Sequence, residues 1–289
     1  MASIRQLKSR IRSVKNTKQI TRAMEMVAAS KMRRAQDATK ATSPYAHAAN
    51  ELLTYLASQN VTDTHPYFTQ RPVAKRLFIV IASDKGLAGA YNSNVLRRLT
   101  RELKEDAAMG IGSTMLTIGR RATRFAARLK DAEIMGAYDD MSDRPSGHEL
   151  RTIVDTATNA FTQGHVDAVD VIFTEFHNAV KQEVVVKRIL PAGYTYTPTC
   201  DYACDAAYEP SPQVVLDAVA YRLIESQIYQ TLLDARASEH SMRMVAMKNA
   251  TDNASDLADD LTLEMNKARQ GAITQELAEI SGGVEAMNN

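Results

Sequence analysis

The first sixty residues carry apolar side chains at alternating intervals of three and four positions. Ile4, Leu7, Ile11 and Val14 begin this pattern, which is the spacing of a coiled-coil seam. Lys18 interrupts it, and the stripe restarts with a second set of apolar residues: Ile20, Met24, Val27, Tyr45, Ala49, Leu52 and Leu56. Because the same period resumes beyond Pro44, we expect this proline to kink the helix without ending it. The pattern predicts one long helix over residues 3–58.

The last eighty residues show the same period. A helix from Gln213 to about Val284 has Gly271 as its interior helix breaker. Its apolar residues form two runs: Ala250, Ala254, Leu257, Leu261, Met265 and Ala268, then Ile273, Leu277, Ile280 and Val284. A stripe this narrow needs a partner along its length, and the first helix is the obvious one. We therefore expect an antiparallel pair of helices, with the longer C-terminal helix covered at its tip by something else.

The middle of the chain alternates between strand and helix patterns, after a linker at residues 62–72. The expected strands cover residues 75–82, 113–118, 134–138, 168–176 and 183–190, and the expected helices cover 91–107, 120–129 and 148–163. This alternation predicts a mostly parallel, Rossmann-like sheet, and the short loop before the last strand indicates an antiparallel pair there. The predicted fold class is α/β, with N-terminal and C-terminal coiled-coil helices over residues 1–60 and 210–289 and an α/β domain over 73–192.

Glycine and proline support this division. No glycine precedes Gly86, and no proline precedes Pro44 or follows Pro212. Both ends are therefore almost free of helix breakers, which argues against a sandwich or barrel with turn residues every 8–12 positions or so. The longest apolar run, Leu77–Ala82, is too short to span a bilayer. The first residues also lack a signal-peptide core, so we expect no direct membrane insertion. Two cysteines do not make a disulfide framework, so we expect a reducing compartment.

Charge is unevenly distributed, although the net charge is only +1. Residues 1–40 hold eleven basic and two acidic side chains, a net +9, whereas residues 252–289 hold two basic and eight acidic ones, a net −6. The basic helix could be a solvated face of a two-stranded rod, a surface for an acidic protein, or a nucleic-acid surface. The absence of aromatic residues before Tyr45 argues against base stacking.

The motifs of common catalytic sites do not occur in complete form. No Gly-Lys pair is present for a phosphate loop, and no GxSxG nucleophile elbow occurs. His148 and Glu149 could open a zinc-binding HExxH helix, but Thr152 stands in place of the second histidine. We expect no catalytic centre, metal or cofactor.

A glycine-containing turn and a pair of cysteines each allow two interpretations, one functional and one structural. Gly86 and Gly89 lie between a strand and a helix, where backbone N–H groups could hold an anion or simply form a turn or a partner contact. Cys200 and Cys204 could form a redox pair or remain ordinary thiols on a loop.

Several long motifs resemble the gamma subunit of the rotary ATP synthases. AMEMVAASKM at Ala23–Met32 is highly specific, and MVAMKNATDNASDL at Met244–Leu257 and NKARQGAITQELAEISGG at Asn266–Gly283 match equally well. The turn SDKGLAGAYN at Ser83–Asn92 is similar to that of the family, which usually has Cys and Gly where Ala88 and Ala90 stand here. The resemblance covers the whole chain.

The resemblance implies the central rotor shaft of the complex. The helical pair would enter the ring of alpha and beta subunits, while the sheet domain would meet the epsilon subunit and the membrane ring of c subunits. Proton flow would turn the shaft, which would perform no bond chemistry and bind no nucleic acid. We expect a peripheral location on the cytoplasmic face of the bacterial inner membrane, or on the matrix side in a mitochondrion.

The resemblance also implies rotor–stator contact residues. Met24 matches the motif position that faces the beta lever, with plain coiled-coil packing as the alternative. Four further residues match C-terminal positions that couple to Met24: Arg243, Gln270, Thr274 and Glu276. A third set is chosen by charge, to meet acidic lever segments of the beta subunits: Arg10, Lys15, Arg33, Arg34 and Lys85.

Overall fold

The computed structural model describes residues 4–57, 65–129, 133–143, 145, 147–179, 181–193, 209 and 212–288. Cys200 and Cys204, the proposed redox pair, lie outside these ranges. The chain divides into two compact units: unit 1 is Met1–Ala28 with Met244–Asn289, and unit 2 is Ala29–Arg243. Helices α1 (Ile4–Ala57) and α5 (Pro212–Asn288) each contribute to both units. The two long helices are therefore as predicted, and α1 continues through Pro44.

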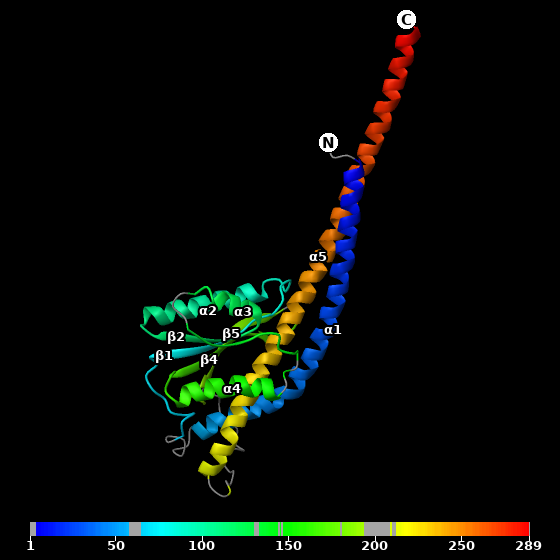
Figure 1. Cartoon of the computed structure of the whole chain (residues 1–289). Helices are drawn as coiled ribbons and strands as arrows, with labels where there is room; N and C mark the ends of the chain where they lie inside the picture. Colours follow the sequence, from blue (N-terminus) through cyan, green and yellow to red (C-terminus); the bar gives the residue numbers. More distant parts are fainter. Residues whose placement is uncertain are drawn as a thin grey trace. The chain divides into compact units, whose positions relative to one another are not determined.

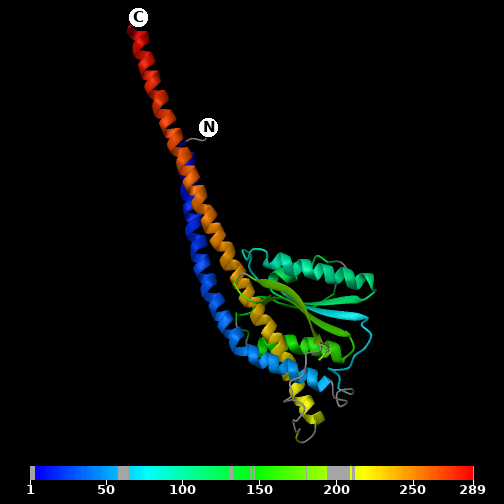
Figure 2. The ribbon, with the colours of Figure 1, turned by 180° about the vertical axis from the view of Figure 1, so that it is seen from behind.

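In unit 1, α1 and α5 lie side by side and run in opposite directions (Figures 1 and 2). Leu7 and Ile11 pack against Leu261 near the start of α1. Farther along α1, Thr251 donates a hydrogen bond to Thr21 at 2.8 Å. The predicted antiparallel pair is confirmed.

The packed positions of this pair follow a strict four–three spacing that includes polar residues. On α1 they are Leu7, Ile11, Val14, Lys18, Thr21, Glu25 and Ala28, and on α5 they are Met247, Thr251, Ala254, Ala258, Leu261, Met265 and Ala268. The Lys18 ammonium donates to the Ser255 hydroxyl at 2.8 Å, which gives it a hydrogen-bond partner at the seam. Since the seam keeps its phase through these polar positions, the predicted seam residues Ile20, Val27 and Leu257 are instead exposed, at 61%, 57% and 49%.

Unit 2 contains a five-stranded sheet. Its strands are β1 (Lys75–Ile81), β2 (Gly112–Ile118), β3 (Glu133–Tyr138), β4 (Ala168–Phe176) and β5 (Gln182–Leu190). They lie in the order β3-β2-β1-β4-β5, all parallel except for the β4–β5 pair. The predicted sheet and its antiparallel edge are both confirmed.

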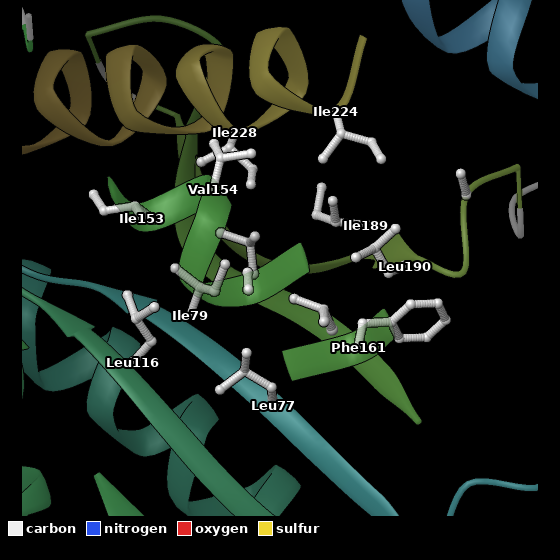
Figure 3. Close-up of a cluster of buried hydrophobic side chains, with 14 of the residues drawn as sticks. Leu77, Ile79, Leu116, Ile153, Val154, Phe161, Ile189, Leu190, Ile224 and Ile228 are labelled. Carbon is white, nitrogen blue, oxygen red and sulfur yellow. The ribbon is translucent and has the colours of Figure 1, made fainter. Parts of the chain in front are cut away.

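Alternate residues of β1 point into two hydrophobic clusters on opposite faces of the sheet. Phe78 and Val80 pack under α2 (Tyr91–Ala108) and α3 (Arg120–Ala126). Leu77 and Ile79 face α4 (Gly147–Thr162) and the first part of α5, together with residues of α1. Figure 3 shows this second cluster, in which Val154 of α4 lies next to Ile228 of α5. The sheet is therefore covered on both faces within unit 2, and α5 is part of its core.

The third helix is shorter than expected. We predicted it to Leu129, but α3 ends at Ala126 because the backbone tightens there. The N–H groups of Arg128 and Leu129 bond to carbonyls three residues back, at 3.0 Å each, as is common where an α-helix ends.

Candidate functional site

The turn between β1 and α2 presents a strained, exposed leucine. Leu87 has a φ of 63° and is 62% exposed, and Lys85 beside it is exposed as well. A bulky residue in the left-handed region is an outlier that persists only where its surroundings enforce it, commonly at functional sites. Here the Ser83 hydroxyl donates to the Lys85 carbonyl at 2.6 Å, and Asn92 accepts from the Ser83 N–H at 3.0 Å.

Our sequence reasoning missed Leu87. The available signal was an apolar residue between Gly86 and Gly89 in a turn, where polar residues are usual. The two departures from the family pattern are accommodated. Ala88 is buried, and Ala90 has a φ of −84°, a conformation that does not require glycine.

Three charged residues of α5 hold this turn. Glu239 accepts from Arg236 at 2.9 Å and from Arg243 at 2.8 Å, one guanidinium on each carboxylate oxygen. Arg243 also reaches the Lys85 carbonyl oxygen at 3.5 Å, and Arg236 lies 3.7 Å from the Asp84 carboxylate. The structure therefore brings together two predicted contact residues, Lys85 and Arg243. Only 13% of the Arg243 side chain is exposed.

Side chains of α5 lie against the carboxyl ends of β1 and β4, where open α/β sheets usually bind ligands. The Ser238 hydroxyl donates to the Thr174 carbonyl of β4 at 3.1 Å. Tyr91, at the start of α2, is fully buried, and this burial raises the pKa of its phenol far above the usual value. This packing favours a turn or partner contact at Gly86 and Gly89 over an anion site.

The loop after β3 is clamped between α1 and α5. Asp143 accepts hydrogen bonds from His240 of α5 at 3.0 Å and from Lys31 of α1 at 2.8 Å. The His240 bond, followed by that of Lys31, holds the pKa of Asp143 well below its ordinary value. Arg236 donates to the Met141 carbonyl at 2.9 Å in the same loop.

Helix α1 carries the remaining N-terminal contact residues. Arg10 and Lys15 are exposed in unit 1, and Met24 is half-buried. Exposed apolar residues lie on the same stretch: Ile20, Met26 and Val27. In unit 2, Arg33 and Arg34 are exposed, and Arg34 donates to the Ser30 hydroxyl at 3.1 Å. Unit 1 thus presents a mixed basic and apolar surface on α1.

The C-terminal part of α5 extends past the start of α1 in unit 1 (Figures 1 and 2). Gln270, Thr274 and Glu276 lie there and are exposed, with Thr274 donating to the Gln270 carbonyl at 2.9 Å. A stripe of exposed apolar residues accompanies them: Ile273, Leu277 and Ile280. The helix continues through Gly271, and a Cβ there would meet no described atom within 4 Å. This tip therefore has no cover from the described part of the chain.

The described residues also lack the features of two other classes of site. They contain no group of three His, Cys, Asp or Glu side chains that could hold a metal ion. Among them, no helix is long and apolar enough to cross a membrane.

Comparison with known proteins agrees with the predicted resemblance. The ATP synthase family model matches residues 3–287. The ATP synthase gamma chain of Stenotrophomonas maltophilia is 43% identical over 99% of this chain and 100% of its own length. That of Ralstonia nicotianae is 39% identical with the same coverage.

Solved structures show the same architecture. A chain of the mitochondrial ATP synthase central stalk and c-ring of Tetrahymena thermophila is 26% identical, with a TM-score of 0.61 over 80% of this chain and 99% of that one. A chain of the Euglena gracilis mitochondrial ATP synthase shares the fold, with 18% identity and a TM-score of 0.71 over 98% of this chain and 94% of that one. By its family match and by these relatives, the chain belongs to the ATP synthase gamma chain family.

Proposed function

We propose that this chain works as the central rotor shaft of its ATP synthase. As a gamma chain it is a subunit of an enzyme complex, and we infer that it forms and breaks no bond itself. Unit 1 enters the ring of alpha and beta subunits, and unit 2 meets the epsilon subunit and the c-ring. The observation that supports this role best is the tip of α5, where exposed apolar residues continue beyond the helical pair.

The mechanism is a shift of conformational populations by unequal contacts. A rotor that presents different faces to three identical catalytic subunits stabilises a different conformation in each. Moving one site from 1:99 to 99:1 requires about 5.5 kcal/mol of preference. The helical pair of unit 1 has such unequal faces, because the basic and apolar outer face of α1 differs from the acidic C-terminal part of α5.

The contact residues divide into three groups in this proposal. Arg10, Lys15 and Met24 on α1 meet the beta lever inside the ring. Lys85 and Arg243, joined through the β1–α2 turn, act from unit 2, as do two exposed arginines of α1: Arg33 and Arg34. The exposed tip residues contact the inner wall of the ring: Gln270, Thr274 and Glu276. For Met24, its half-buried side chain also fits the alternative of plain coiled-coil packing.

The proposed role also implies on which side of the membrane the chain lies. The chain binds its membrane ring from the side that carries the catalytic head, which is the cytoplasmic face of the inner membrane in a bacterium or the matrix side in a mitochondrion.

A basic coiled-coil adaptor for nucleic acid is the alternative of a different class. Among the first forty residues, which hold the basic excess, three of the exposed apolar side chains of α1 are aliphatic or methionine, Ile20, Met26 and Val27, and the exposed aromatic Tyr45 lies beyond them. Those three side chains cannot stack on bases as aromatic residues do, which favours the protein partner.

Reconstitution tests the proposal. The purified chain, mixed with alpha and beta subunits, is expected to form a salt-stable complex and to stimulate ATP hydrolysis. Duplex DNA in place of the subunits is the control for the alternative. Binding to DNA that weakens as salt rises, as phosphate contacts do, combined with no stimulation of hydrolysis, would overturn the rotor function.

A further inference from the structure

We propose that Glu239 is a positioning residue for rotor–stator coupling, because it holds Arg243 on the turn that carries Lys85. This inference rests on the proposed function. Glu239 itself is 4% exposed, so it does not reach a partner subunit directly. Its effect on coupling must pass through the side chains that it binds.

The first step is the engagement of both carboxylate oxygens. Oε1 accepts from Arg243 Nη2 at 2.8 Å, and Oε2 accepts from Arg236 Nη1 at 2.9 Å. Charge-assisted hydrogen bonds of this length in a buried setting are strong and directional. The two arginines lie seven residues, or about two turns, apart on α5 with Glu239 between them, and without Glu239 their like charges would repel each other.

The second step connects these two arginines to two neighbouring residues at the start of the turn, Asp84 and Lys85. Arg243 Nη2 donates to the Lys85 carbonyl at 3.5 Å, and Arg236 lies 3.7 Å from the Asp84 carboxylate. Asp84 in turn accepts from the backbone N–H groups of Arg120 at 3.2 Å and Asp140 at 3.0 Å. Asp84 therefore ties the turn to the loops after β2 and β3, and Glu239 is connected to Asp84 through Arg236.

The third step concerns the orientation of Arg243. Its Nη1 lies 3.4 Å from His240 Nδ1, and His240 Nε2 lies 3.0 Å from Asp143. The tautomer that satisfies both contacts carries its proton on Nε2, so that Nδ1 accepts from Arg243. Glu239 and His240 thus fix Arg243 from two sides, and Arg243 in turn contacts the Lys85 carbonyl, two residues before the strained Leu87.

Hydrogen exchange on the full chain tests the positioning directly. In Glu239→Gln, which keeps the shape and removes the charge, the hydrogen-bonded amides of the turn and of the loops that Asp84 binds are expected to exchange about tenfold faster. These are the N–H groups of Ser83, Tyr91, Arg120 and Asp140. Glu225→Gln is the matched control, since Glu225 lies on the same helix and pairs with Arg222. The double variant Glu239→Gln with Arg243→Ala should exchange no faster than Glu239→Gln alone. Unchanged exchange at the turn, or acceleration spread evenly over the sheet, would overturn the inference.

Coupling in the assembled enzyme supplies the second readout. Proton pumping per ATP hydrolysed is expected to fall about threefold in Glu239→Gln and to stay at the parent level in Glu225→Gln. The parent chain separates the two claims. If it fails to stimulate hydrolysis, the proposed function fails. If it stimulates hydrolysis and both variants then couple equally well, the role of Glu239 alone fails.

Discussion

At the scale of single residues, the buried Asp234 of α5 has a strongly shifted acidity. Burial in unit 2 and the nearby Glu175 raise its pKa to about 7, although Gln230 donates to its carboxylate at 3.3 Å and Lys187 lies near. Lys187 is buried too, and this burial lowers the pKa of its ammonium group. Asp234 therefore binds a proton more tightly in the folded chain than in the unfolded one.

This difference predicts a pH dependence of stability. The unfolded carboxyl has a pKa of about 3.8, so the contribution of Asp234 is present below that pH and is lost as pH rises towards 7. Asp234→Asn cannot ionise, and it should raise the free energy of unfolding at pH 8 by about 2–4 kcal/mol while changing it little at pH 4. Urea unfolding at both pH values measures this, with the exposed Asp252→Asn as control. Equal effects at both pH values would contradict the assignment.

The residues that sequence reasoning misplaced share one physical cause. A hydrophobicity pattern cannot register a polar residue whose hydrogen bonds are met inside a seam. Lys18 and Thr21 occupy packed positions because Ser255 and Thr251 satisfy them. A prediction from apolar residues alone skips Lys18 and Thr21 and places the next seam position at Ile20, so the predicted seam then follows the wrong side of the helix. Leu87 was missed because a hydrophobicity pattern carries no information on the sign of a residue's φ angle, which is +63° here.

At the scale of elements, α5 contains two stripes with different roles. Leu261 is buried in the helical pair, whereas Leu277 is 62% exposed on the tip. Leu261→Ala should cost about 2–3 kcal/mol of stability because it removes packed atoms, and Leu277→Ala should change stability by less than about 0.5 kcal/mol. Thermal unfolding of the isolated chain measures both. A large loss for Leu277→Ala would mean that the tip packs against this chain itself.

Elements of regular pattern were the most predictable part. The strand Ala168–Phe176 was predicted with its observed bounds, because a buried strand shows as a continuous apolar run. Helix ends were less predictable, since α3 stops by tightening its last turn, without a glycine or proline to mark it. The pairing between Lys85 and Arg243 could not be derived from spacing at all, because 158 residues separate them. The resemblance to the family singled out Arg243, charge singled out Lys85, and the contact role of both stays a prediction.

At the scale of the whole molecule, the uneven charge predicts how the chain assembles with its partners. The excess of +9 over residues 1–40 should accelerate encounter with acidic subunits at low salt. Arg10→Glu with Lys15→Glu is expected to slow association with the alpha–beta complex about tenfold at low ionic strength, and the two rates should converge near 1 M salt, where the screening length is about 3 Å. The control is Arg97→Glu with Lys104→Glu, which makes the same change in net charge on exposed positions of α2. If both pairs slow association equally, net charge alone guides assembly, and the basic face of α1 has no special part in it.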